Sequence, residues 1–171
     1  MQIESNFAEA NNRKYPEGVA IALAKDRTGK VNPITLGWFM TTSIQPRMLA
    51  ISVAHNRHSL DAIRHSKEFV LALPSLAMAE ETLYYGTKSG RDTDKLADCS
   101  AATQPAMRVD CLLLSDAVVN FECSLSGELT TGDHVIFAGE VLAVHVNQDQ
   151  SVRRLYTVGP NYKMGGVTPD A

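Results

Sequence analysis

Cysteine is scarce in this sequence of 171 residues, and the placement of the few cysteines excludes several kinds of site. There are three, Cys99, Cys111 and Cys123, so the number is odd, and no two stand in a C-x-x-C spacing. This pattern argues against a disulfide framework and against a thiolate zinc site. We therefore expect free thiols in a reducing, cytoplasmic compartment, and no metal site.

Long apolar runs and dense basic clusters are also missing. The formal net charge is −3, and no segment concentrates Lys and Arg, so a nucleic-acid partner is not expected. The longest apolar stretch, residues 135–146, is interrupted by Glu140 and is too short to cross a bilayer. The polar first residues, with Glu4 and Glu9, do not resemble a signal peptide. We expect a soluble protein with no membrane partner.

Nucleotide-binding fingerprints are absent as well. No G-x-G-x-x-G run follows any strand-like segment. Residues 86–91 (GTKSGR) resemble the end of a Walker A loop, but Thr87 stands where a glycine must precede the lysine, so a P-loop is rejected. What remains is a basic loop with Lys88 and Arg91. It is either a solvated surface loop or a contact to a phosphate or cofactor.

Short apolar segments separated by turn residues are what the sequence does contain. The length and the 44% hydrophobic content suit one domain over residues 1–171, with a core of about 15–166. Period-two alternation predicts strands with one wet face, as in residues 119–126. We expect strands over residues 19–24, 31–39, 48–53, 69–73, 119–126 and 135–146. This pattern predicts a mainly β (α+β) fold, a closed or nearly closed antiparallel barrel with short inserted helices.

Three short helices are expected between these strands, over residues 59–65, 76–84 and 92–97. Ser59 is predicted to be the N-cap of the first helix. Residues 96–109 are rich in small side chains and are expected to be irregular, and residues 98–109 match no motif of the sequence. Gly139 marks a bulge or a close approach of two backbones within the last strand.

The first candidate site is the stretch GWFMTTSIQP, which contains the only tryptophan, Trp38. The hydroxyls of Thr41, Thr42 and Ser43, with nearby backbone N–H groups, are suited to hydrogen-bonding the polar edge of a flat heterocycle. The alternative is a polar connection between two strands, with Trp38 in the core.

A second candidate is the stretch HNRHS, and a third is the hairpin turn GDH. Arg57 can bind a phosphate through two N–H donors, and a helix beginning at Ser59 would present free N–H groups to the same anion. His55 and His58 have a spacing that metals use, but no carboxylate or cysteine accompanies them, so solvent-exposed histidines are preferred. In the hairpin turn, His134 is either a donor to a cofactor or substrate oxygen or an ordinary surface histidine.

The order and spacing of these motifs resemble the flavin reductase-like FMN-binding family, which includes flavoredoxins and the reductase components of two-component monooxygenases. The resemblance covers about residues 15–166. It is carried by GW with TTS, by RHS, by KSGRD followed by DK, and by the hairpin GDH with GEV. It implies a split β-barrel that forms a homodimer, with FMN in a groove near the subunit interface.

The resemblance also implies roles for individual residues. For the flavin ring the implied residues are Asn32, Trp38, Thr41, Thr42, Ser43 and Tyr162, and for the phosphate they are Arg57, His58, Ser59 and Lys88. His134 would stand near the nicotinamide and the flavin, and it is the catalytic candidate.

On this resemblance we expect an NAD(P)H:flavin reductase that transfers hydride from NADH or NADPH to FMN. A monooxygenase or another redox protein is the candidate partner. Two alternatives share the same fold and cofactor contacts. One is a flavoredoxin-like electron-transfer protein that is reduced by a protein partner, and the other is a non-catalytic flavin-binding split-barrel protein.

Overall fold

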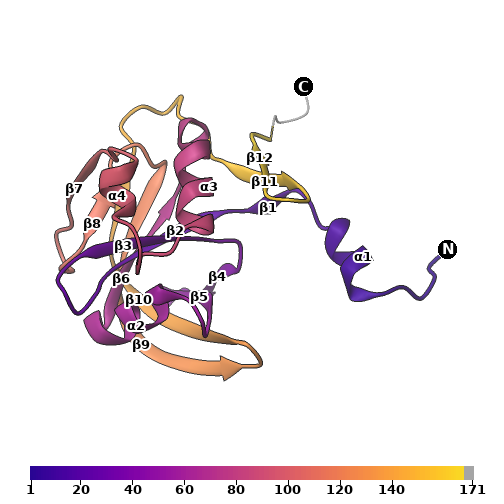
Figure 1. Ribbon diagram of the computed structural model, residues 1–171, viewed down its shortest axis with the longest axis horizontal. Coiled ribbons are helices and arrows are strands. Elements are labelled where there is room, and N and C mark those ends of the chain that lie inside the picture. Colours follow the sequence, from indigo (N-terminus) through magenta and orange to yellow (C-terminus); the bar gives the residue numbers. More distant parts are fainter. Residues whose placement is uncertain (168–171) are drawn as a thin grey trace.

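A curved antiparallel sheet of seven strands organises the protein. The computed structural model describes residues 1–167, and Figure 1 shows how its elements are arranged. The strand order in the sheet is β3-β2-β6-β9-β10-β5-β4. Its strands are β2 (Ala20–Lys25), β3 (Val31–Leu36), β4 (Phe39–Ser43), β5 (Met48–Ala54), β6 (Glu68–Leu73), β9 (Val119–Thr131) and β10 (His134–Val146). The predicted mainly β fold with short helices between strands is confirmed.

Strands β2 and β6 are apolar on both faces because each face covers a separate core. Ala22 and Phe69 face the first core, which α2 (His58–Ser66) helps to cover. Ile21 and Val70 face the second core, which includes Tyr85 of α3 (Ala79–Thr87). Full burial of each large apolar side chain contributes about 1.5–3 kcal/mol, so these two strands hold the fold together from both sides.

Glu122, which is fully buried, fixes the segment 98–109 against the sheet. Its carboxylate accepts backbone N–H groups from Met107, Arg108 and Val109, and a 2.5 Å bond from Nε2 of His145. Burial opposes ionisation of the carboxyl, but these hydrogen bonds hold the pKa of Glu122 below its usual value. The segment was expected to be irregular, and most of it is.

Five short elements form the chain between β6 and β9. Part of segment 98–109 forms a strand, β7, which pairs with β8 in a two-stranded sheet. The elements are η1 (Leu76–Met78), α3, α4 (Lys95–Asp98), β7 (Thr103–Pro105) and β8 (Leu112–Leu114).

The structure corrects several predicted boundaries. Residues 31–39 form two strands, because the chain leaves the sheet edge at Gly37 and Trp38 and β4 then pairs with β5. The helix predicted over 76–84 is a 3₁₀ turn followed by α3, and the helix predicted over 92–97 is reduced to α4. In both cases the apolar spacing located the element but not its first turn.

The prediction that Ser59 is an N-cap is wrong. Helix α2 begins at His58, Arg57 is its N-cap residue without a side-chain cap bond, and Ser59 lies inside the first turn. The expectation for Gly139 is confirmed, because the β9–β10 register shifts beside it. A Cβ there would stand 2.7 Å from Cζ of Phe69.

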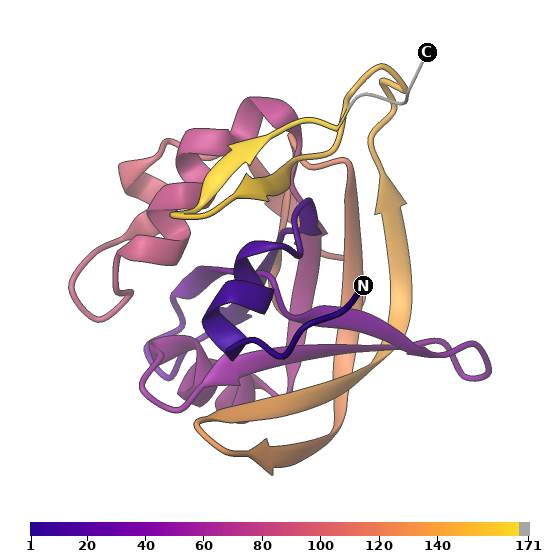
Figure 2. The same cartoon turned by 90° about the vertical axis from the view of Figure 1, so that its right-hand side faces the viewer.

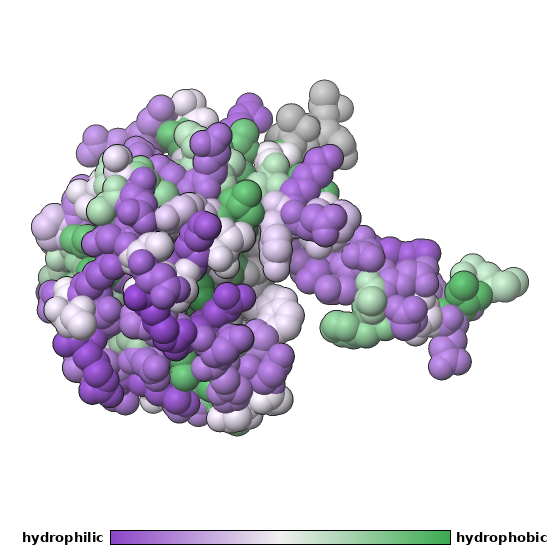
Figure 3. Space-filling view, in the orientation of Figure 1, coloured by the Kyte–Doolittle hydropathy of each residue, from purple (hydrophilic) through white to green (hydrophobic). Residues whose placement is uncertain are grey.

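The N-terminal segment lies apart from the body of the protein. Figure 1 shows α1 (Phe7–Asn12) away from the sheet, Figure 2 shows the same helix end-on to this separation, in front of the sheet, and none of its residues is buried. A small sheet of β1 (Glu17–Gly18), β11 (Tyr156–Gly159) and β12 (Lys163–Gly165) joins the two ends of the described chain. Hydrophilic side chains predominate on the face shown in Figure 3. Within residues 1–167, no helix combines the length and apolarity that a membrane span requires.

Candidate functional site

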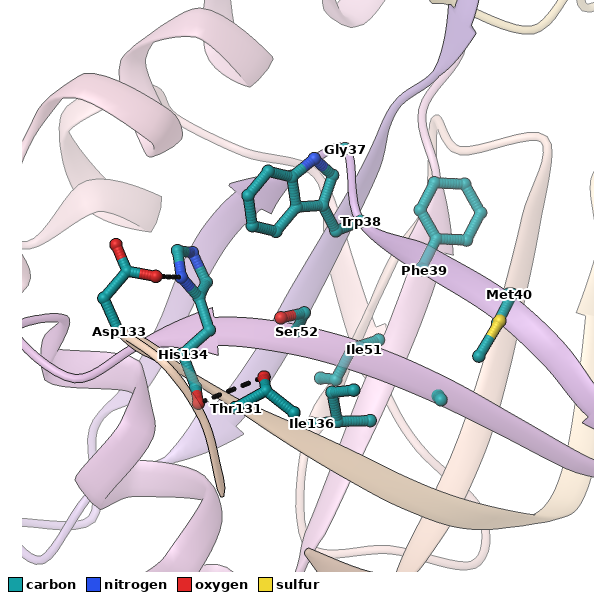
Figure 4. Close-up of a pocket in the computed structure, with 11 residues that line it drawn as sticks. Gly37, Trp38, Phe39, Met40, Ile51, Ser52, Thr131, Asp133, His134 and Ile136 are labelled. Carbon is teal, nitrogen blue, oxygen red and sulfur yellow. Dashed lines mark hydrogen bonds and ion pairs between the residues drawn. The ribbon is translucent and has the colours of Figure 1, made fainter. Parts of the chain in front are cut away.

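A cavity of about 460 Å³ opens beside the β9–β10 turn, over a surface formed by β4, β5 and the start of β10. Its lining is mostly apolar, with a few polar groups at the end near the turn, as Figure 4 shows. The residues that matter for its chemistry are Trp38, Met40, Ser52, Asp133, His134 and Ile136. We call this cavity the Trp–His pocket.

Trp38 and His134 lie against each other at one end of this pocket. Their ring centroids are 4.7 Å apart and the rings are tilted by 42°. The backbone oxygen of Trp38 accepts the N–H of Ser52 at 2.9 Å, which fixes the chain where it leaves the sheet edge. Trp38 is 51% exposed, so the alternative that it is a core residue is wrong.

The side chain of Asp133 orients His134. The Nδ1–H of His134 donates to Oδ1 of Asp133 at 2.6 Å, which leaves Nε2 as the ring nitrogen available to a ligand. This hydrogen bond holds the pKa of the exposed Asp133 carboxyl below its usual value. A carboxylate that accepts from one ring nitrogen fixes the tautomer and direction of the other, as a histidine acting on a ligand requires.

A second cavity, of about 180 Å³, lies between α2, α3 and the loop before α4. Four cationic side chains line it, and no carboxylate side chain of the described residues does. The cations are Arg57, Lys88, Arg91 and Lys95. The first turn of α2, whose N–H groups have no partner inside the helix, opens onto the same space. We call this cavity the basic pocket, and its charge and N–H donors suit an anion.

Asn32 and Gly90 close one wall of the basic pocket. Asn32 is 2% exposed, and its Nδ2 donates to Oγ of Ser59 at 2.7 Å. Its Oδ1 is buried and has no hydrogen-bond partner among the described residues. The loop backbone covers that oxygen so closely that a Cβ on Gly90 would stand 1.9 Å from it. Arg91 ties the same loop to the opposite wall by donating to the backbone oxygen of Asn56 at 3.0 Å.

His58 is held from behind by Asp26. Its Nε2–H donates to Oδ2 of Asp26 at 3.1 Å. Burial opposes ionisation of Asp26, but hydrogen bonds from Thr28, His58 and the backbone of Lys30 lower its pKa to about 2. The Asp26 carboxylate therefore stays charged at neutral pH and fixes the first turn of α2 beside the basic pocket.

The end of β5 connects the two pockets. Ala54 pairs with His134 in the β5–β10 ladder, and the next residue, His55, donates its N–H to the backbone oxygen of Asp133 at 3.1 Å. Asn56 then already lines the basic pocket. A few residues of chain therefore separate the polar end of the Trp–His pocket from the cations. One elongated ligand can span such a separation.

The structure brings most of the predicted residues into these two pockets. Trp38 and His134 line the Trp–His pocket. Five predicted residues line the basic pocket: Asn32, Arg57, His58, Ser59 and Lys88. Asn32, expected near the flavin ring, therefore lies with the residues expected near the phosphate.

Four predicted residues line neither pocket. Thr41, Thr42 and Ser43 continue β4 beyond Met40, along the edge of the sheet. Tyr162, 69% exposed, lies in the turn between β11 and β12.

Sequence reasoning missed several residues of the site, including Ser52, Gly90 and Lys95. Gly90 and Lys95 stand in the KSGRD and DK motifs that carry the resemblance, but nothing in those motifs assigns either residue to this pocket, and Ser52 stands in no motif. Lys95 follows an acidic residue at the start of a short helix, a position in which a solvent-exposed lysine is equally common. The contact of Gly90 with Asn32 joins segments that are far apart in the chain.

The three cysteines are free thiols and lie outside both pockets. Burial raises the pKa of Cys111 to about 11 and that of Cys123 to about 12. Neither thiol is therefore activated as a nucleophile at neutral pH. Residues 1–167 contain no group of three or more His, Cys, Asp or Glu side chains arranged to hold a metal ion.

Comparison with known proteins decides the family. The family model for the flavin reductase like domain matches residues 12–164, almost the whole described chain. The chain belongs to the flavin reductase-like family. It is similar to an uncharacterised protein of Archaeoglobus fulgidus, with 30% identity over 115 residues, which are 67% of this chain and 65% of that protein. The match thus spans about two thirds of that relative's length.

Solved structures show the fold of this flavin reductase-like protein. The flavoredoxin of Methanosarcina acetivorans superposes with a TM-score of 0.86 at 22% identity, covering 100% of this chain and 94% of the other. An FMN-binding protein of Thermus thermophilus gives a TM-score of 0.82 at 20% identity, covering 100% and 95%. The seven-stranded sheet with its inserted helices is therefore the split β-barrel that the sequence predicts.

Proposed function

We propose that the protein is an FMN-dependent NAD(P)H:flavin reductase. The observation that carries this proposal is a pair of pockets on either side of the end of β5, one cationic and one aromatic with an oriented histidine, in a chain of the flavin reductase-like family. The names of two proteins with this fold, a flavoredoxin and an FMN-binding protein, support a flavin ligand.

The residues of the basic pocket fit the phosphate of FMN. Arg57 and Lys88 supply charge, and the first turn of α2 supplies N–H donors. Asn32 supports this turn from behind, because its Nδ2 donates to Oγ of Ser59 at 2.7 Å.

The Trp–His pocket fits a planar ring system. Its apolar wall, with Met40 and Ile136, excludes water from one face, and the half-exposed Trp38 offers an aromatic surface. When bound, the flavin itself accepts hydride from the nicotinamide and supplies the redox chemistry. Nε2 of His134, which is an acceptor in this tautomer, positions the nicotinamide by accepting a hydrogen bond from the N–H groups of its carboxamide.

A cytoplasmic homodimer is the assembly that we propose. Several large apolar side chains on β4, on β9 and in the turn after β4 are open to solvent, namely Met40 at 58%, Leu129 at 62% and Ile44 at 76%. Exposed apolar surface of this kind marks an interface in soluble proteins. Sedimentation of the purified protein at several concentrations would show a dimer, and a monomer at all concentrations would contradict this assembly.

Anaerobic reduction tests the proposed activity. The protein with bound FMN is mixed with NADH, and separately with NADPH, while the visible flavin bands are followed. Bleaching by one or both nicotinamides is the expected result. Bands that persist would contradict the reductase. If a reduced redox protein bleached them instead, the chain would be an electron carrier, and if nothing did, a flavin-binding protein.

A further inference from the structure

Arg154 is a half-buried cation without an anionic partner among the described residues. Its Nε is buried and makes no hydrogen bond within the described part of the chain. No carboxylate of residues 1–167 forms an ion pair with its guanidinium. An unsatisfied buried donor is rare in a folded protein, and a guanidinium offers five N–H donors. Arg154 is therefore suited to an acceptor that comes from outside the chain.

Two aromatic rings hold this guanidinium in place. Its Cζ lies 5.1 Å from the ring centroid of Tyr156 and 5.7 Å from that of Phe39. The backbone of Gly18 lies close to the same group, since a Cβ there would stand 2.9 Å from a terminal nitrogen of Arg154 and 3.0 Å from Cζ of Phe39. A guanidinium that is already fixed by such contacts loses little freedom when it binds an oxyanion through two N–H donors.

Phe39 connects Arg154 to the Trp–His pocket. Phe39 lines that pocket, and Figure 4 shows it well apart from His134. In the sheet, Phe39 pairs with Ile51. His134 pairs with Ala54, three residues farther along β5, which is a distance of about 10 Å. No lysine or arginine of the described residues lines the pocket itself, so a ligand that leaves it beside Phe39 meets the charge of Arg154.

We propose that Arg154 binds the pyrophosphate of the nicotinamide dinucleotide that reduces the flavin. The inference rests on the proposed function, in which the flavin ring and the nicotinamide share the Trp–His pocket and His134 orients the carboxamide. Two stacked ring systems fill a cavity of about 460 Å³, so the phosphates of the dinucleotide lie at its rim. A ribose joins the nicotinamide to the pyrophosphate, and this unit leads from His134 toward Phe39 and Arg154. The cations of the basic pocket, on the other side of the end of β5, stay with the flavin phosphate.

Stopped-flow reduction of the FMN-loaded protein by two reductants tests this assignment. NADH carries the pyrophosphate, whereas N-benzyl dihydronicotinamide is neutral and lacks it. In Arg154→Met, the dissociation constant for NADH should rise about tenfold or more, the worth of one charge-assisted contact. The limiting rate with NADH and the rate constant for the neutral reductant should stay unchanged. The matched control is Arg153→Met, an exposed neighbouring arginine that lines neither pocket and should leave all these constants unchanged.

Binding measurements without turnover complete the test. The affinity for FMN should be the same in the wild type and in Arg154→Met. ADP-ribose, which keeps the pyrophosphate but lacks the nicotinamide, should compete with NADH for the wild type, and adenosine should not. This competition tests the pyrophosphate contact even if Arg154→Met does not fold.

Several results would overturn the role of Arg154 and leave the reductase intact. They are an unchanged dissociation constant for NADH in the folded variant, equal losses with the two reductants, a loss of FMN affinity, and equal competition by adenosine and ADP-ribose. A change in the sedimentation of Arg154→Met would also overturn it, because the guanidinium would then belong to a contact between subunits. Failure of both NADH and NADPH to reduce the wild type would overturn the proposed function itself, and this inference with it.

Discussion

Adding one methyl group at Gly90 should damage the basic pocket without touching any charged side chain. The backbone of Gly90 lies over Asn32, and a Cβ in the present geometry would stand 1.9 Å from Oδ1 of Asn32 and 3.0 Å from Cδ2 of His58. Ordinary contacts of a Cβ begin near 3.4 Å. In Gly90→Ala, either the loop or the Asn32 side chain must therefore move by about 1.5 Å.

The cost of this movement can be bounded. Forcing an extra carbon into a packed site costs about 1–3 kcal/mol. Movement of the loop withdraws Lys88 and Arg91 from the pocket, and movement of Asn32 breaks its 2.7 Å bond to Ser59. Because binding requires the closed geometry, most of the cost should appear as weaker FMN binding, about 5- to 150-fold.

The assay is FMN binding by the wild type, by Gly90→Ala and by Gly127→Ala. Gly127 is the matched control because it lies in β9, where a Cβ would have no other heavy atom within 4 Å, so alanine fits there without displacement. Gly90→Ala should bind FMN more weakly, and Gly127→Ala should bind it like the wild type. Unchanged affinity in Gly90→Ala would refute the inference that this loop closes the site.

Four further predictions address single groups. Arg57→Ala should weaken the binding of FMN by about tenfold or more and the binding of riboflavin very little. Equal losses of affinity for the two ligands would contradict a contact between Arg57 and the phosphate. His134→Ala should slow anaerobic flavin reduction by NAD(P)H, followed by stopped flow, more than it weakens FMN binding. An unchanged rate of reduction would contradict a role of His134 in positioning the nicotinamide. Asp26→Asn should lower the free energy of unfolding, measured with urea at pH 7, by about 2 kcal/mol. Because the folded pKa is depressed, this difference should persist above pH 4 and vanish as the pH falls toward 2, and a pH-independent difference would contradict it. A thiol reagent at pH 7 should leave Cys111 and Cys123 unmodified until the protein is unfolded.

The sequence predicted the strands well because their apolar faces are local patterns. In β2 and β6 both faces are apolar, and both prove to be buried. The break at Gly37 and Trp38 was missed, because the apolar run continues through it and only the pairing of β4 with β5 bends the chain there.

The candidate site was predictable where its residues stand in a recognisable order. Arg57 and His134 belong to motifs that are read directly along the chain. The burial of Lys95 and the fit of Gly90 over Asn32 depend on contacts between distant segments, which no local pattern encodes. The hydroxyls of Thr41 and Thr42 suggest a ligand contact, but strand β4 carries both residues along the sheet edge beyond both pockets.

Fluorescence of Trp38 tests the central claim most directly, because it is the only tryptophan and it lines the Trp–His pocket. The wild type is titrated with FMN while tryptophan emission is followed, first alone and then with inorganic phosphate present. Quenching should saturate at one FMN per chain, and inorganic phosphate should shift the titration to higher FMN concentrations. Absence of quenching and of binding would contradict the claim that the two pockets together hold a flavin mononucleotide.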